Sequence, residues 1–205
     1  MLSKAKICVL VSGGGTNLGA LIAAEREGII KSGTISLVIS NRPDAYALTR
    51  AMEAGIPTAV FEKKKYSDAL AFEADVMDKI DKEGIDLIVL AGFMCILSEK
   101  FTSHYKDRII NVHPSLIPSF CGAGFYGLKV HEAALSYGVK VSGATVHFVN
   151  EIPDGGKIIM QRAVEVKEGD TPETLQRRIM EEAEWKILPL SCEKICKEMK
   201  EKKNG

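Results

Sequence analysis

The sequence has no excess charge of either sign and no apolar run of membrane-spanning length. Lys and Arg number 27 together, as do Asp and Glu, so the formal net charge at pH 7 is zero. A chain without a net field attracts neither nucleic acid nor an anionic membrane over its whole surface. A membrane helix also needs about 20 consecutive apolar residues. We therefore expect no nucleic acid and no membrane as partner, whereas a small anionic ligand needs only a local site.

Cysteine is sparse, and no export signal precedes the first apolar run. The chain has five cysteines, which are Cys8, Cys95, Cys121, Cys192 and Cys196. An odd number without a signal peptide indicates reduced thiols and a cytoplasmic location. Cys192 and Cys196 are four apart on a predicted helix, but no second ligand pair accompanies them. Helix packing is therefore expected there, and no metal site is predicted.

The first half of the sequence alternates short apolar runs with helical patterns. Strands are predicted at residues 7–11, 36–40, 58–61 and 87–91. Helical patterns begin at Leu18 and cover residues 45–54 and 70–82. This order predicts right-handed crossovers and an α/β fold with a Rossmann-like, doubly wound, mostly parallel sheet.

After residue 108 the pattern changes, and the C-terminal half adds strands and a long helix. Strands are predicted at residues 109–112, 141–149 and 158–166, with a helix at 130–137. A helical pattern covers residues 171–200 with a break expected at Pro189, and residues 198–205 read as a solvated end. With no repeat and no low-complexity linker, residues 1–205 are predicted to form a single domain of 205 residues.

A glycine-rich turn, Ser12-Gly13-Gly14-Gly15-Thr16-Asn17, separates the first strand from the first helix. Such a turn presents free backbone N–H groups to an anion at a helix N-terminus, and Thr16 and Asn17 are expected to cap the helix. Leu18 replaces the third glycine of a dinucleotide motif, no acidic residue follows the second strand, and no Walker lysine is present. The turn favours a monophosphate over a dinucleotide; a tight turn without ligand is the alternative.

Asn111 and His113 flank Val112 at the end of a predicted strand, so their side chains point to the same side. Open α/β sheets bind ligands beyond the carboxyl ends of their strands. Histidine suits proton transfer near neutral pH, and an Asn amide offers N–H donors to a developing oxyanion. A strand-end histidine bonded only to backbone is the alternative.

Asp154 is a candidate third member, because an ionised carboxylate near His113 would raise the pKa of the histidine. An Asp-Gly pair is also a routine turn signal. Thr145 and His147 alternate on one face of the preceding strand, and His147 by itself reads as a structural histidine with satisfied hydrogen bonds.

The string Asn111-Val112-His113-Pro114-Ser115-Leu116-Ile117-Pro118 resembles the hallmark of the formyltransferases that use 10-formyltetrahydrofolate. Further similar strings are residues 12–17, Leu90-Ala91-Gly92-Phe93-Met94, and Gly143 to Val149 leading to Asp154-Gly155-Gly156. The resemblance covers about residues 6–190, with the motifs in the family's order.

The resemblance implies direct transfer of the formyl group of 10-formyltetrahydrofolate, a co-substrate, to the primary amine of 5′-phosphoribosylglycinamide in purine biosynthesis, through a tetrahedral intermediate and without metal. It implies a catalytic set of Asn111, His113 and Asp154, and a phosphate site of Gly15, Thr16 and Asn17. The implied folate site is Met94, Cys95, Ile96, Leu97, Asn111, Val149, Glu151 and Asp154. Glu184 is the implied contact of the substrate amine end, in a helix that is one residue longer than the common pattern.

The resemblance also divides the domain into a phosphate-binding half (1–108), a catalytic and folate-binding half (109–190), and a C-terminal helix and tail (191–205). Ala69 replaces a basic residue near the donor's glutamate tail, and the lysines at 63–65 either compensate or form a solvated loop. Methionyl-tRNA formyltransferases share the core but carry a basic C-terminal domain, so length and zero net charge disfavour them. Formyltetrahydrofolate deformylases share the core but usually carry an extra N-terminal domain, and the start of this sequence close to the first predicted strand disfavours them. Small-molecule substrates are the expected partners of a monomer or homodimer.

Overall fold

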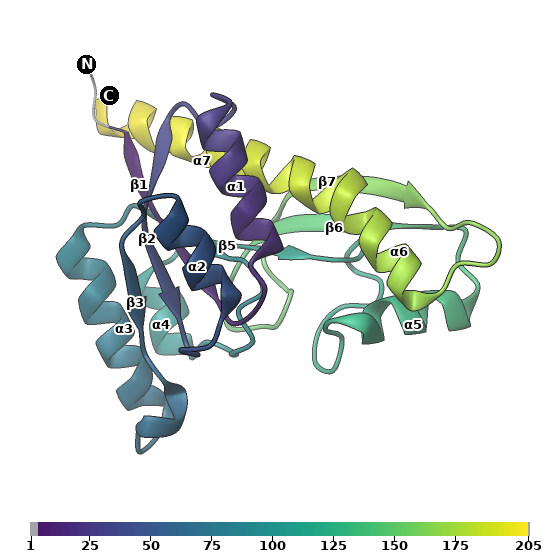
Figure 1. The fold of residues 1–205 in the computed structure, drawn as a ribbon, viewed down its shortest axis with the longest axis horizontal. Helices are drawn as coiled ribbons and strands as arrows, with labels where there is room; N and C mark the ends of the chain where they lie inside the picture. Colours follow the sequence, from purple (N-terminus) through teal and green to yellow (C-terminus); the bar gives the residue numbers. More distant parts are fainter. Residues whose placement is uncertain (1–3, 205) are drawn as a thin grey trace.

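One seven-stranded β-sheet runs along the length of the molecule (Figure 1). The computed structural model describes residues 4–204. The strand order is β3-β2-β1-β4-β5-β6-β7; the pairs from β3 to β5 are parallel, and β6 and β7 add in antiparallel fashion. The strands are β1 (Ala5–Val11), β2 (Gly33–Ser40), β3 (Thr58–Val60), β4 (Leu87–Leu90), β5 (Ile109–His113), β6 (Val141–Phe148) and β7 (Ile158–Glu165).

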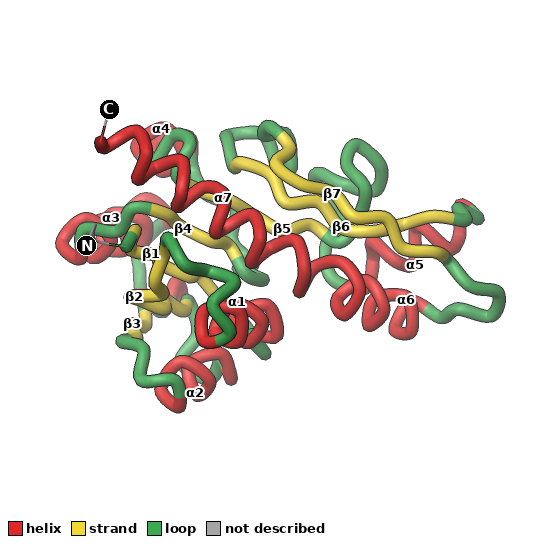
Figure 2. The backbone as a smooth tube through the Cα atoms, turned by 90° about the horizontal axis from the view of Figure 1, so that it is seen from above, coloured by secondary structure: helices red, strands yellow, loops and turns green. Residues whose placement is uncertain are grey.

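Helices cover both faces of the sheet, which explains the continuous apolar runs of β1 and β4. The α-helices are α1 (Thr16–Arg26), α2 (Tyr46–Glu53), α3 (Ala69–Glu83), α4 (Glu99–His104), α5 (Leu128–Tyr137), α6 (Pro172–Ile179) and α7 (Trp185–Asn204). Side chains from α1, α2, α6 and α7 form the core on one face, and those from α3 and α4 form the core on the other. Seen from above, α7 crosses the sheet along its long direction, and α5 lies beside α6 (Figure 2).

The predicted α/β fold and its elements are confirmed, with ends that shift by a few residues. The sequence patterns missed α4, whose six residues are too few for a clear helical period. Ser98 begins α4, since its side chain accepts a hydrogen bond from the Phe101 amide. The sheet continues across residue 108, and α7 continues across residue 190, so neither position is a structural boundary. The division into functional parts at these two positions stays a prediction.

The break expected at Pro189 is wrong. Pro189 lies inside α7, and the helical run changes earlier, at the π-turn η2 (Met180–Glu184). Pro189 removes one hydrogen bond near the helix start, and the burial of its neighbours Ile187 and Leu188 holds the segment in place. The end expected to be solvated from Glu198 is helical as far as Asn204; Gly205 and residues 1–3 lie outside the described residues.

Within residues 4–204, no helix is both long enough and apolar enough to cross a lipid bilayer.

Candidate active site

The sequence-predicted site residues gather at the carboxyl edge of the parallel strands. The connections run in opposite directions from β1 and β4, and this reversal opens a crevice at the strand ends. The glycine turn follows β1, the segment from Gly92 follows β4, and His113 ends β5. The fold therefore brings together three motifs that are far apart in the sequence.

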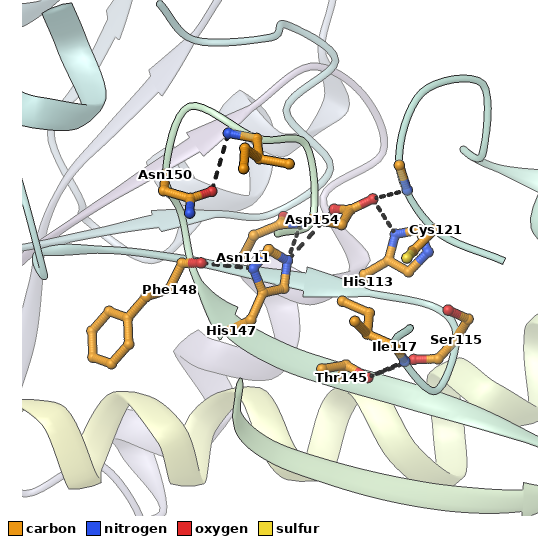
Figure 3. A network of polar contacts seen from close by, with 12 residues as sticks. Asn111, His113, Ser115, Ile117, Cys121, Thr145, His147, Phe148, Asn150 and Asp154 are labelled. Atoms are coloured by element: carbon orange, nitrogen blue, oxygen red, sulfur yellow. Dashed lines mark hydrogen bonds and ion pairs between the residues drawn. The ribbon is translucent and has the colours of Figure 1, made fainter. Parts of the chain in front are cut away.

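Asn111, His113, His147 and Asp154, which we name the histidine end, form one contact network (Figure 3). Antiparallel pairing sets Asn111 opposite His147, so both side chains lie on the same face of β5 and β6. Asp154 lies between the two imidazoles: Oδ2 is 3.5 Å from His113 Nδ1, and Oδ1 is 3.5 Å from His147 Nε2. The three implied catalytic residues are thus adjacent.

A tight loop after β6 delivers Asp154 to this position. Asp154 itself has a left-handed backbone, with φ 56°. At Gly156, an added Cβ would lie 1.8 Å from the Phe148 carbonyl oxygen, so the close return of the loop requires glycine. From the opposite side, the Gly122 amide donates a hydrogen bond of 2.8 Å to Asp154 Oδ2. The carboxylate is therefore held by its own loop and by residues 121–127.

Carbonyl groups near the two histidines determine where their protons sit. His113 Nε2 lies 2.9 Å from the Phe120 carbonyl oxygen, which only accepts, so Nε2 carries a proton. His147 Nδ1 likewise donates to the Phe148 carbonyl at 2.8 Å. His147 Nε2 is then free to accept from Asn111 Nδ2 at 3.2 Å. One amide N–H of Asn111 is thereby fixed, and its second N–H remains for a ligand.

Burial controls the charge of the histidine end. His113 is only 5% exposed, and burial lowers the pKa of its imidazole, although the Asp154 charge and the Phe120 carbonyl oppose that shift. Asp154 raises the pKa of His113, as expected, but desolvation outweighs the carboxylate, so the net pKa is lowered. Burial alone would raise the pKa of Asp154, but contacts with His147, His113 and Gly122 lower it overall. A neutral imidazole thus faces an ionised carboxylate at neutral pH.

Residues 13–17 together with Glu184 form the second part of the site, which we name the glycine-loop end. Gly15 is the N-cap of α1 in a left-handed conformation, with φ 69° and no side-chain cap. The predicted capping by Thr16 and Asn17 is therefore wrong, since both lie within the helix. Thr16 Oγ1 instead lies 3.9 Å from Met180 Sδ, and Asn17 Nδ2 donates to Glu184 Oε2 at 2.7 Å.

Glu184 is a buried carboxyl group at the C-terminal end of the π-turn η2. It is 6% exposed, and burial raises its pKa to about 7, with the Asn17 hydrogen bond opposing the shift. Wide turns of this kind take up one extra residue in a helix. The π-turn brings Glu184 into contact with Asn17 of the glycine turn, and the extra residue implied by the resemblance stays a prediction.

The four residues after β4 that the resemblance assigns to folate differ in exposure. Met94 is 59% and Ile96 is 76% exposed, whereas Leu97 is buried in the core beside α3 and α4. Cys95 is half-buried, and its thiol accepts a hydrogen bond from Asn41 Nδ2 at 3.0 Å. This segment therefore exposes two apolar side chains, Met94 and Ile96, at its surface.

A cavity of about 510 Å³ opens beside this segment. Its lining contains two apolar or thiol side chains, two neutral polar ones and three cationic ones, namely Met94, Cys95, Ser12, Asn41, Arg42, Lys63 and Lys64. Of the remaining folate candidates, Val149 is half-buried and donates its amide to the Ile109 carbonyl, and Glu151 is exposed. No cluster of three His, Cys, Asp or Glu side chains within residues 4–204 has the spacing to hold a metal ion.

Three groups that contribute contacts to the histidine end were not predicted from the sequence patterns. Two are backbone groups, the carbonyl of Phe120 and the amide of Gly122, and a sequence carries no side-chain signal for these. The third is His147, which has the satisfied hydrogen bonds expected of it but also touches Asn111 and Asp154. Its place on the same strand face as Thr145 was the available signal.

Comparison with known proteins places this chain in a family. Residues 5–191 match the formyl transferase family, and the chain belongs to that family. The phosphoribosylglycinamide formyltransferase of Haemophilus influenzae is 44% identical over 185 residues, which cover 90% of this chain and 84% of that protein.

Two further relatives show how the similarity is distributed. The crystal structure of glycinamide ribonucleotide transformylase 1 from Symbiobacterium toebii has a TM-score of 0.88 at 42% identity, with 95% of this chain and 88% of that chain covered. The human trifunctional purine biosynthetic protein adenosine-3 is 44% identical over 94% of this chain. This chain spans only 18% of the length of that multifunctional relative.

Proposed function

We propose that the chain is an enzyme that transfers the formyl group of 10-formyltetrahydrofolate to the primary amine of 5′-phosphoribosylglycinamide. The observation that carries the proposal is the buried contact of Asp154 with His113 and His147, with Asn111 held beside it. The identity of 44% to a relative named phosphoribosylglycinamide formyltransferase supports this choice of acceptor.

Asn111 stabilises the charge that develops during transfer. As the amine attacks the formyl carbon, the carbonyl oxygen becomes an oxyanion. The amide N–H of Asn111 that is not bound to His147 donates to that oxygen. His147 keeps the amide oriented before the substrate arrives, which lowers the cost of reorganisation.

His113 carries the proton from the attacking nitrogen to the leaving nitrogen. Its lowered pKa leaves the imidazole neutral before reaction, so it can accept a proton from the attacking amine. The Asp154 carboxylate stabilises the imidazolium that results. His113 then donates this proton to the folate nitrogen as the bond between that nitrogen and the formyl carbon breaks.

The glycine-loop end holds the acceptor. Gly15, Thr16 and Asn17 bind its phosphate through backbone amides at the start of α1. Glu184, bonded to Asn17, contacts the amine-bearing part of the substrate. The phosphate-binding residues and Glu184 are joined by this hydrogen bond, so both contact the acceptor from the glycine-loop end of the site.

The folate donor lies along the segment after β4 and the loop after β6. Met94 to Leu97, Val149 and Glu151 contact the pterin, while Asn111 and Asp154 face its reacting side. Folates end in glutamate carboxylates, and Lys63 and Lys64 supply positive charge to the cavity beside Cys95, whereas Arg42 is paired with Asp44 at 2.7 Å. The donor tail therefore extends into this cavity.

The proposal includes small-molecule substrates as the partners and a cytoplasmic location. The five cysteines are all free, and three of them are buried, as suits a reducing compartment.

Incubation with 5′-phosphoribosylglycinamide and 10-formyltetrahydrofolate tests the proposal. Folate release is followed optically, and formylation of the acceptor is followed by mass spectrometry. Equal amounts of released folate and formylated acceptor are expected. Release of formate without any acceptor would instead identify a deformylase, and formylation of methionyl-tRNA would identify the other member of the family.

A further inference from the structure

Helix α2 holds two consecutive carbonyl groups of the glycine turn. The Ala47 amide donates to the Gly13 carbonyl at 3.0 Å. One helical turn further on, Arg50 Nε donates to the Gly14 carbonyl at 2.9 Å. Both carbonyls therefore point towards α2.

Because peptide bonds are planar and trans, these two carbonyl contacts also fix where the backbone amides of Gly14 and Gly15 point. In each peptide the N–H lies opposite the C=O, so the N–H groups of Gly14 and Gly15 point away from α2. Within residues 4–204, the backbone amides of residues 14–17 form no hydrogen bond. The amides of Gly14 and Gly15 are thus oriented away from α2 at the start of α1, and those of Thr16 and Asn17 follow them as the first amides of the helix.

Arg50 is itself held in place from two sides. Its guanidinium carbon lies 5.0 Å from the centroid of the Tyr46 ring, in cation–π contact. On the other side is Gly19, where an added Cβ would lie 3.5 Å from Arg50 Nη1. The half-buried guanidinium therefore lies between α1 and α2, and its positive charge lies next to the glycine turn.

We infer that Arg50 is a positioning residue for phosphate binding: it holds the Gly14 carbonyl away from the anion so that the amides of Gly14 and Gly15 face the phosphate. This inference rests on the proposed function for its choice of acceptor. Arg50 also places a positive charge on the α2 side of the glycine turn, and this charge favours the binding of an anion on the opposite side of the turn.

Arg50→Met tests the role, because methionine keeps the aliphatic contact with Tyr46 but loses both the donor and the charge. Binding of ribose 5-phosphate, followed by calorimetry, should weaken about tenfold, as befits a lost charge-assisted hydrogen bond. The KM for the phosphorylated acceptor should rise by the same factor, while kcat and the donor KM stay within about twofold. Arg50→Lys should restore part of the affinity, since it keeps the charge.

Two controls separate positioning from general damage. Arg26→Met removes an exposed arginine in the last turn of α1 and should leave every constant unchanged. The dephosphorylated acceptor should be formylated equally by wild type and Arg50→Met, because the loop has no phosphate to hold.

An unchanged affinity of Arg50→Met for ribose 5-phosphate would overturn the inference, as would an equal loss with the dephosphorylated acceptor. If ribose 5-phosphate binds through Arg50 but no formyl transfer occurs, then the proposed function fails and the inference about Arg50 stands.

Discussion

The two ends of the site consist of different chemical groups. The glycine-loop end consists mainly of backbone groups, and Gly13, Gly14 and Thr16 are exposed. The histidine end consists of side chains, and His113 and His147 are only 5% and 1% exposed. An anion is bound well by several amides at an open helix start, whereas proton transfer needs a shielded imidazole. We therefore expect damage to the first end to raise KM, and damage to the second to lower kcat.

The largest effect should come from His113→Ala. Loss of an oxyanion donor typically costs about 10²–10³ in rate, and loss of the proton carrier should lower kcat by at least that factor. The acceptor KM should stay within a few-fold. Steady-state kinetics with a thermal melt check this outcome, and His104→Ala, at an exposed histidine paired with Asp81, serves as the control. A folded variant with wild-type kcat would disprove the role of His113.

Glu184→Gln tests whether burial raises the pKa of the Glu184 carboxyl group at the glycine-loop end. The pKa of Glu184 is raised from 4.5 to about 7, so the folded protein binds a proton more tightly than the unfolded chain. This stabilisation is complete below pH 4.5 and is lost as the pH rises towards 7. At about 1.4 kcal/mol per pKa unit, the loss is about 3 kcal/mol.

Urea unfolding of wild type and Glu184→Gln at pH 5 and pH 8 measures this effect. The free energy of unfolding of wild type should fall relative to the variant between these two values. Glu182→Gln, at an exposed position in the same turn, should behave like wild type. A constant difference between wild type and Glu184→Gln would show that this carboxyl does not titrate in that range.

Gly15→Ala should damage binding without damaging chemistry. Its Cβ would lie 2.6 Å from that of Ala47, and its φ of 69° disfavours any side chain. Left-handed strain costs about 1–3 kcal/mol, and displacement of the loop should raise the acceptor KM about tenfold while kcat is kept.

Gly28→Ala is the matched control for Gly15→Ala. Gly28 has a similar φ of 73°, but nothing lies within 4 Å of an added Cβ. It should therefore lose stability without any change in KM. If both variants raised the acceptor KM equally, the contact between the loop and α2 would have no part in binding.

The smallest effect should come from the cavity lysines. Lys63 and Lys64 line the cavity, whereas Lys65 forms an ion pair with Glu62 at 2.5 Å. The double variant Lys63→Ala, Lys64→Ala should raise the KM for the folate donor about threefold, a change suited to exposed charges. Lys65→Ala should leave it unchanged. Steady-state kinetics at two salt concentrations checks both, and equal effects of all three lysines would argue against a tail site.

The sequence was sufficient for features that depend on local pattern. The runs at β1 and β4 and the spacing of Asn111 and His113 predicted the sheet and a shared strand face. The contact of His113 with Asp154 depends on antiparallel pairing of β5 with β6, which no local pattern encodes. The direction of the His113 pKa likewise depends on burial, which the whole fold determines.

The π-turn η2 has a consequence for how α6 and α7 pack. One extra residue in a regular α-helix rotates everything beyond it by about 100°. Here Leu175 and Ile179 before the turn and Ile187 and Cys192 after it all lie in the same core. The widened turn therefore takes up one additional residue locally, and the side chains of α6 and α7 on either side of it remain packed in the same core.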